Sequence, residues 1–172
     1  ALYTALGEGA EPEPTATQIG RRSLRNTALS YLCDAPDHPG IALADIQYNT
    51  ADNMTDRLAA LGQLVDAGGN EADAALADFY QRWEADALVI DKWFAIQARS
   101  SHEHTMDRVK ELTKHDAFKL SNPNRLRSLI GVFAAGNQRH FHSADGAGYE
   151  LLIDTVIELN SLNPQTAARL LG

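Results

Sequence analysis

Long apolar runs, cysteines and clusters of basic residues are scarce in this chain of 172 residues. No segment approaches the ~20 consecutive apolar residues that a membrane-spanning helix needs, and the N-terminus has no basic run followed by an apolar stretch. Fifteen Lys and Arg residues stand against 23 Asp and Glu residues, so the formal net charge is −8. This charge balance counts against nucleic acids and anionic membranes as partners. We therefore expect a soluble protein that binds neither.

Cys33 is the only cysteine, so no disulfide can form within the chain. A chain without disulfides is compatible with the reducing cytoplasm, where we expect this protein to reside. Leu29 and Leu32 precede Cys33 in a stretch with helical spacing of apolar residues. A buried structural thiol is the role that this setting predicts, since nothing nearby would lower the thiol pKa.

The alternation of polar and apolar residues that predicts strands is also missing. Apolar residues instead recur at spacings of three and four, as at Leu58, Leu61 and Leu64, which is typical of amphipathic helices. About ten helices joined by short polar connections predict an all-α fold, and helix pairs of roughly 35–45 residues have the size of HEAT or armadillo units. We expect an irregular superhelical array of antiparallel helix pairs, with a globular bundle as the alternative.

The beginning and the end of the chain differ in composition from the rest. Residues 7–14 are acidic and rich in Gly and Pro, which predicts a linker. Residues 1–14 are therefore expected to be an upstream tail and linker, and residues 15–172 a helical domain. The helix that Pro164 opens has barely two turns before Gly172, although it still offers apolar residues. We expect the domain to be truncated at this end.

Residues 119–134 form the most informative segment, because a polar helix start leads directly into an apolar helix. Asn122 can cap the first free N–H groups, and Pro123 suits the first helical position. Arg125 lies in the first turn, where a cation beside the positive helix end is unfavourable. Its placement indicates a nearby carboxylate or a ligand.

The same segment resembles the C-terminal domain of the bacterial-type aminopeptidase N family, also called alanyl aminopeptidases, which are zinc-dependent exopeptidases. Further segments resemble that domain in the expected order: Gly20–Asn26, Ala51–Asp56, Leu88–Phe94 and Leu159–Gln165. The resemblance extends from about residue 18 to the end of the chain. It covers only the last part of the family's longer polypeptide, so we expect this chain to be a domain of such an enzyme.

The zinc motif of these peptidases, His-Glu-x-x-His, is absent from the sequence. In its nearest approach, which begins at His102, Met106 stands where the second His should be. His104 and the later pair His140 and His142 have no Cys or acidic ligand at a supporting spacing, and surface histidines are the better interpretation. We expect no metal, no cofactor and no catalytic residue in this chain, and zinc only in the parent enzyme.

The resemblance implies that the domain packs on the catalytic domain of the same polypeptide and closes the active-site cavity over small peptide substrates. Asn122, Asn124 and Arg125 are the candidate residues of the cavity wall, where a guanidinium could meet a peptide carboxylate. The opposing interpretation is that Asn122 only caps, Asn124 only faces solvent and Arg125 only pairs with an acidic neighbour. The alternative function is a free-standing helical scaffold for another protein.

Other polar residues have structural explanations. Asp91 lies in a mostly apolar helix, where a charge persists only with a partner, so we expect an ion pair between helices. Asp52, Asn53 and Asp56 resemble a crowded helix N-cap, and the spacing of a calcium-binding EF-hand is missing. Trp93 stands at helical spacing with other large apolar residues and is expected in the core.

Overall fold

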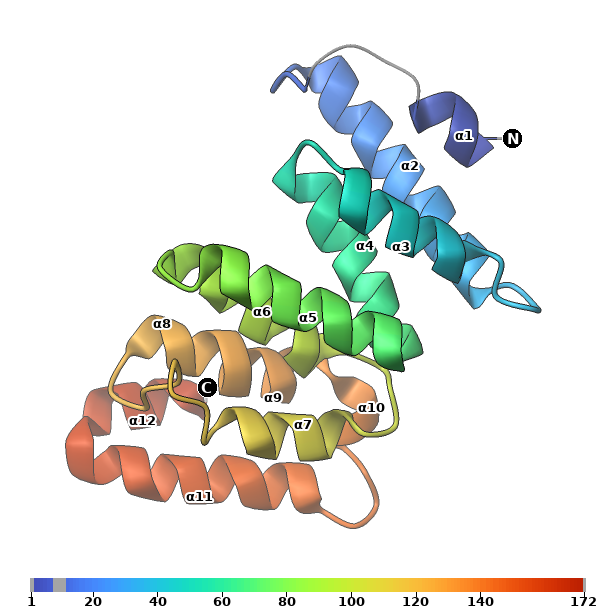
Figure 1. Cartoon of the computed structure of the whole chain (residues 1–172). Coiled ribbons are helices and arrows are strands. Elements are labelled where there is room, and N and C mark those ends of the chain that lie inside the picture. The colour runs from blue at the N-terminus through green and yellow to red at the C-terminus, as the bar shows by residue number, and fades with distance from the viewer. Residues whose placement is uncertain (1, 8–11, 172) are drawn as a thin grey trace. The chain divides into compact units, whose positions relative to one another are not determined.

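A computed structural model of the chain describes residues 2–7 and 12–171 (Figure 1). Helices and turns, without strands, make up these described residues, and the all-α prediction is confirmed. The helices are α1 (Leu2–Gly7), α2 (Ala16–Asp34), α3 (Gly40–Thr50), α4 (Met54–Ala67), α5 (Asn70–Trp83), α6 (Ala87–Arg99), α7 (Thr105–Leu112), α8 (Pro123–Leu126), the π-helical turn η1 (Arg127–Gly131), α9 (Val132–Gly136), α10 (Gln138–Phe141), α11 (Ala147–Leu162) and α12 (Pro164–Leu170).

Side-chain caps fix where several helices begin. The Oγ1 atom of Thr15 accepts a hydrogen bond from the backbone N–H of Gln18 at the start of α2. Asn53 caps α4 and Asn163 caps α12 in the same way. Such caps satisfy N–H groups that have no partner within the helix, so each fixes the residue at which its helix begins.

The described chain divides into two units, Ala1–Asp78 and Phe79–Gly172, with the boundary inside α5. In the first unit, α2 and α3 lie side by side and run antiparallel, and α4 packs on both (Figure 1). Their apolar faces meet in a core that includes Leu29, Ala44, Leu61 and Leu64, each at most 1 % exposed. This burial of apolar surface is the main force that holds the three helices together.

Helix α1 also packs on α2 within the first unit, and its Tyr3 is buried. Residues 12–14 have no regular secondary structure, and residues 8–11 of the expected linker lie outside the described residues. The division of the chain at residue 14 stays a prediction.

The close crossing of α2 and α3 depends on Gly40. A Cβ atom at this position would lie 2.3 Å from the backbone nitrogen of Cys33 and 2.5 Å from the carbonyl carbon of Leu32. Any side chain would therefore push the two helices apart. Cys33 itself is 6 % exposed, which confirms the expectation of a buried thiol.

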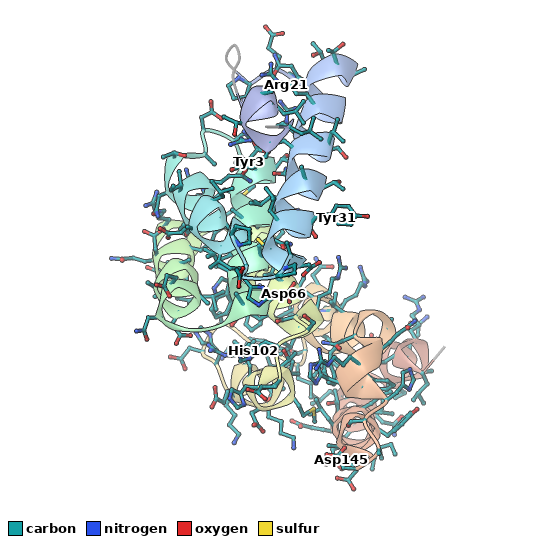
Figure 2. All side chains as sticks on the ribbon, turned by 90° about the vertical axis from the view of Figure 1, so that its right-hand side faces the viewer. Tyr3, Arg21, Tyr31, Asp66, His102 and Asp145 are labelled. Carbon is teal, nitrogen blue, oxygen red and sulfur yellow. The ribbon has the colours of Figure 1, made fainter. Side chains whose placement is uncertain are left out.

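The apolar pattern of α2 is more exposed than its spacing suggests. Leu29 is fully buried, whereas Ile19 and Leu24 are about half exposed. Tyr31 is 74 % exposed and points away from the helix, as Figure 2 shows. Ile19 and Leu24 therefore lie outside the buried face that contains Leu29, because α3 and α4 cover only part of the helix surface.

In the second unit, the central helix is α6, against which α7, α8, η1 and α9 pack. Ile90, Phe94 and Ala98 of α6 are buried almost completely. Trp93 is 6 % exposed, as expected for a core residue. Helices α11 and α12 pack on each other and complete this unit.

A π-helical turn, η1, interrupts the segment between Pro123 and Gly136. Around it Leu126, Leu129, Ile130 and Phe133 are all buried, as expected for an apolar helix in this segment. π-helical turns are rare and frequently occur at functional sites. The turn begins two residues after Arg125.

Candidate functional site

The start of α8 is built by Asn122. Its Oδ1 atom accepts hydrogen bonds from the backbone N–H groups of Asn124 at 3.0 Å and Arg125 at 3.3 Å, and Pro123 occupies the first turn. Asn122 and Asn124 are both exposed. The predicted capping role of Asn122 is confirmed, and the side chain of Asn124 faces solvent at the same helix start.

Arg125, in contrast, is 6 % exposed and forms an ion pair with Asp91 of α6. Its Nη1 atom lies 2.8 Å from Oδ1 of Asp91, and its guanidinium lies over the ring of Phe94, 5.1 Å from the centroid. The hydroxyl of Ser128 donates to the carbonyl oxygen of Arg125 at 2.9 Å. The ion pair expected for Asp91 therefore exists, and Arg125 is its partner.

This pair resolves the unfavourable placement of a cation at a helix start. The carboxylate of Asp91 offsets the charge of Arg125, and burial strengthens their attraction. The Nε atom of Arg125 is buried and has no hydrogen-bond partner among the described residues.

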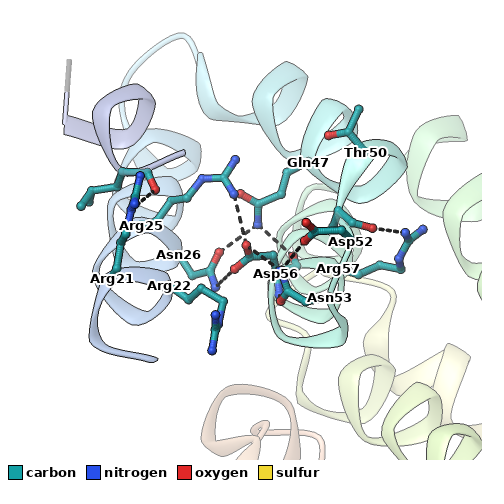
Figure 3. A network of polar contacts seen from close by, with 12 residues as sticks. Arg21, Arg22, Arg25, Asn26, Gln47, Thr50, Asp52, Asn53, Asp56 and Arg57 are labelled. Atoms are coloured by element: carbon teal, nitrogen blue, oxygen red, sulfur yellow. Dashed lines mark hydrogen bonds and ion pairs between the residues drawn. The ribbon is translucent and has the colours of Figure 1, made fainter. Parts of the chain in front are cut away.

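A second polar network lies in the first unit and centres on Asp56 (Figure 3). The Asp56 carboxylate is buried and accepts hydrogen bonds from Nη1 of Arg25 at 3.2 Å, Nδ2 of Asn26 at 2.8 Å and Nδ2 of Asn53 at 3.2 Å. Asn53 in turn accepts from the backbone N–H of Asp56 as the cap of α4. A buried carboxylate with this many hydrogen-bond partners stabilises the packing of α2 against α4.

Tyr3 and Gln47 extend this network to α1 and α3. Tyr3 donates through its hydroxyl to Oε1 of Gln47 at 2.9 Å, and Gln47 donates through Nε2 to the backbone oxygen of Asp56 at 2.8 Å. The guanidinium of Arg25 lies 4.8 Å from the ring centroid of Tyr3. Tyr3 and Gln47 belong to no capping or charge pattern, so the sequence did not predict their place in this network.

The two networks connect segments that resemble the peptidase family. Arg25 and Asn26 belong to Gly20–Asn26, and their partner Asp56 belongs to Ala51–Asp56. Asp91 belongs to Leu88–Phe94, and Arg125 belongs to the segment of residues 119–134. Four of the recognised segments therefore meet in pairs through charged contacts.

The histidines make contacts of their own without forming a metal site. His140 Nε2 lies 3.1 Å from the carbonyl oxygen of Ser101, and His142 Nδ1 lies 2.6 Å from the hydroxyl of Tyr149. Within the described ranges, no group of three His, Cys, Asp or Glu residues is arranged to hold a metal ion. These histidines therefore do not fit a zinc site.

Over the part of the chain that the structure describes, none of the helices is long and apolar enough to cross a membrane. Residues 1–172 match the family described as "Domain of unknown function (DUF3458_C) ARM repeats". The description agrees with the prediction of an armadillo-like array of helix pairs.

Curated relatives with high similarity are aminopeptidases N. The protein of Haemophilus influenzae is 46% identical over 157 residues, which cover 91% of this chain and 18% of that protein. The protein of Escherichia coli is 43% identical over 153 residues, which cover 89% of this chain and 18% of that protein. The protein of Caulobacter vibrioides is 40% identical over 169 residues, which cover 98% of this chain and 20% of that protein.

Among solved structures, the crystal structure of Legionella pneumophila aminopeptidase A in complex with aspartic acid is similar, with a TM-score of 0.88 and 34% identity. The match covers 98% of this chain and 21% of that chain. The chain thus spans about a fifth of the length of the relatives that it matches.

Proposed function

We propose that this chain serves as the C-terminal helical domain of a zinc-dependent aminopeptidase. The chain belongs to the DUF3458_C ARM-repeat family and is homologous to the C-terminal region of aminopeptidase N. The parent enzyme removes N-terminal amino acids from peptides in the cytoplasm. The domain packs on the catalytic domain of the same polypeptide and closes the active-site cavity. It contributes no metal ligand, and the zinc, its bound water and the general base belong to the upstream part of the enzyme.

The observation that carries this proposal is the extent of the homology. Identity of 40% to 46% extends over at least 89% of the chain. A helical domain can support an exopeptidase through its shape, since a rigid helical wall excludes water and bulky substrates from a cavity.

Within this function, we assign the helix start at Asn122, Asn124 and Arg125 to the cavity wall. Asn124 is exposed and offers an amide, Asn122 fixes the helix start, and Arg125 offers a buried donor without a partner among the described residues. The π-helical turn that follows favours a functional role for this segment. The guanidinium, held in place by Asp91, attracts the carboxylate end of a short peptide.

Steady-state kinetics of the complete parent enzyme test this assignment. Asn124→Ala and Arg125→Lys should raise KM for tripeptides about tenfold if each loses one charge-assisted or polar contact. The value of kcat should change little, because the zinc chemistry lies elsewhere. Arg127→Ala, which alters an exposed cation two residues away, is the matched control.

Unchanged KM values in both variants would refute the cavity role and leave the ion pair as purely structural. The wider proposal has a separate test, which is mass spectrometry of the native polypeptide. Peptides upstream of Ala1 that include a His-Glu-x-x-His segment support the peptidase function. A native product without such a segment would favour the free-standing scaffold.

A further inference from the structure

A hollow in the first unit gathers three arginines in an otherwise acidic chain. It is lined by Arg21, Arg22 and Arg25 of α2 together with Gln18, Asn53 and two aspartates, Asp52 and Asp56, and its volume is about 160 Å³. On the same measure one water needs about 10–15 Å³, so the hollow has room for a small group. Figure 3 shows the three arginines on α2 and the two aspartates at the start of α4.

The described residues that line this hollow include three arginines but only two carboxylates. Asp56 is already neutralised by Arg25 through the ion pair at 3.2 Å. Asp52, which is exposed, accepts a hydrogen bond from Nδ2 of Asn53 at 3.0 Å. Of the two aspartates that line the hollow, only Asp52 has no arginine among these contacts. Among the described lining residues, arginines thus outnumber carboxylates, although the whole chain has a net charge of −8.

The contacts of Arg21 and Arg22 also leave donors available. Arg21 donates through Nε to the carbonyl oxygen of Leu6 at 2.8 Å and through Nη2 to that of Ala5 at 3.4 Å. Arg22 donates through Nη1 to Oε1 of Gln18 at 3.1 Å and through Nη2 to the carbonyl oxygen of Glu13 at 3.1 Å.

A guanidinium carries five N–H donors. With the described residues, Arg21 and Arg22 each use two of these five, and neutral acceptors receive all of them. Their positive charges are therefore fixed in position but not compensated by a carboxylate in these contacts.

We propose that this hollow is a binding site for an oxyanion, with Arg22 and Arg21 as its principal ligands. Planar guanidinium groups bind carboxylates and phosphates through paired N–H donors, and fixed arginines lose little conformational freedom when they do so. Arg25 contributes through its position and stays bound to Asp56. The ligand is either a phosphate or the carboxylate of an organic acid, which share this chemistry.

Titration of the 172-residue chain, followed by amide NMR, tests the site. The probes are inorganic phosphate and succinate, each compared with sodium chloride at equal ionic strength. Saturable shifts of the amides in residues 20–26 and 52–56 are the expected result. A response to phosphate alone identifies a phosphate site, and a response to succinate alone identifies a carboxylate site.

Two variants with opposite effects make the test specific. Arg22→Gln should weaken binding about tenfold, since one charged donor pair is lost. Asp52→Asn should tighten it, because the opposing carboxylate disappears while the arginines stay. Arg139→Gln, which removes an exposed cation of α10, should leave the affinity unchanged. Thermal unfolding curves of all three variants establish that they are folded.

The proposal is overturned if neither probe gives saturable shifts, or if Arg22→Gln binds as tightly as the natural chain. An equal loss in Arg139→Gln would also overturn it, because net charge alone would then explain the binding. The hollow belongs to the first unit and Asn122–Arg125 to the second, so this site and the proposed cavity wall can fail independently.

Discussion

The Nη1 atom of Arg125 lies 2.8 Å from Oδ1 of Asp91, and this contact joins the start of α8 to the middle of α6. Both side chains are largely withdrawn from water, with exposed fractions of 8% for Arg125 and 19% for Asp91. The ring of Phe94 covers the guanidinium. An ion pair in such surroundings is costly to break, because removal of one partner leaves the other charge poorly solvated.

Arg125→Ala should therefore lower the free energy of unfolding by about 3 kcal/mol. Asp91→Ala should have a similar effect, and the double variant should lose less than the sum of the two, since each single change already breaks the pair. Urea unfolding followed by tryptophan fluorescence measures these values. Arg127→Ala should stay within about 0.5 kcal/mol, and strict additivity of the first two changes would show that the pair is not coupled.

Asp56→Asn tests the network of the first unit. The amide has the shape of the carboxylate but not its charge, so the ion pair with Arg25 and one acceptor function are lost. A loss of about 2 kcal/mol is expected from hydrogen bonds to a charged group. Asp52→Asn is the control, because its exposed side chain makes no buried contact. Equal stabilities of the two variants would contradict a structural role for Asp56.

Gly40→Ala should destabilise the first unit by about 3 kcal/mol, since the new methyl group collides with backbone atoms that cannot move aside. Gly62→Ala is the matched control in α4, where a Cβ atom meets nothing within 4 Å. That change should be neutral or stabilise by about 0.5–1 kcal/mol, because alanine favours a helix interior. Melting temperatures of the two variants give the comparison, and similar values would refute the close crossing.

Burial, together with the negative charges of Asp34 and Asp66, raises the pKa of Cys33 from 9.0 to about 11. The thiol should therefore resist alkylation by iodoacetamide at pH 8.5 in the folded chain and react readily in guanidinium chloride. Since the folded pKa is the higher one, the neutral thiol contributes its stability below pH 9 and loses it as the pH rises towards 11.

Comparison with Cys33→Ala isolates this effect, because that variant should lose less stability than the natural chain between pH 9 and pH 11. Rapid alkylation of the folded chain at pH 8.5 would contradict the burial of the thiol.

The sequence predicted the parts of the fold that depend on local chemistry. Asn53 and Asn122 could be identified as caps because a cap and the N–H groups that it satisfies lie within three residues. The π-helical turn η1 could not be identified, since the buried residues around it keep the spacing of an ordinary helix. Tyr3 and Gln47 were missed because they are 44 residues apart and meet only in the folded unit.

At the candidate site, too, the sequence predicted local features but not the contacts between distant residues. The sequence indicated that Arg125 needs a nearby carboxylate and, separately, that Asp91 needs a partner in another helix. It did not indicate that each is the partner of the other, because 34 residues separate them and helix packing alone brings them together. The place of Asn122, Asn124 and Arg125 in a cavity wall stays a prediction.

The network around Asp56 also bears on the order in which the polypeptide folds. Its members, from Tyr3 to Asp56, all precede residue 57, and Arg25 is only 31 residues from its carboxylate partner. Chains emerge from the ribosome N-terminus first, and domains generally fold as units during synthesis. The first unit can therefore form the ion pair between Arg25 and Asp56 while the residues of the second are still being translated, and a nascent chain whose residues up to 78 have left the ribosome would already contain a folded first unit.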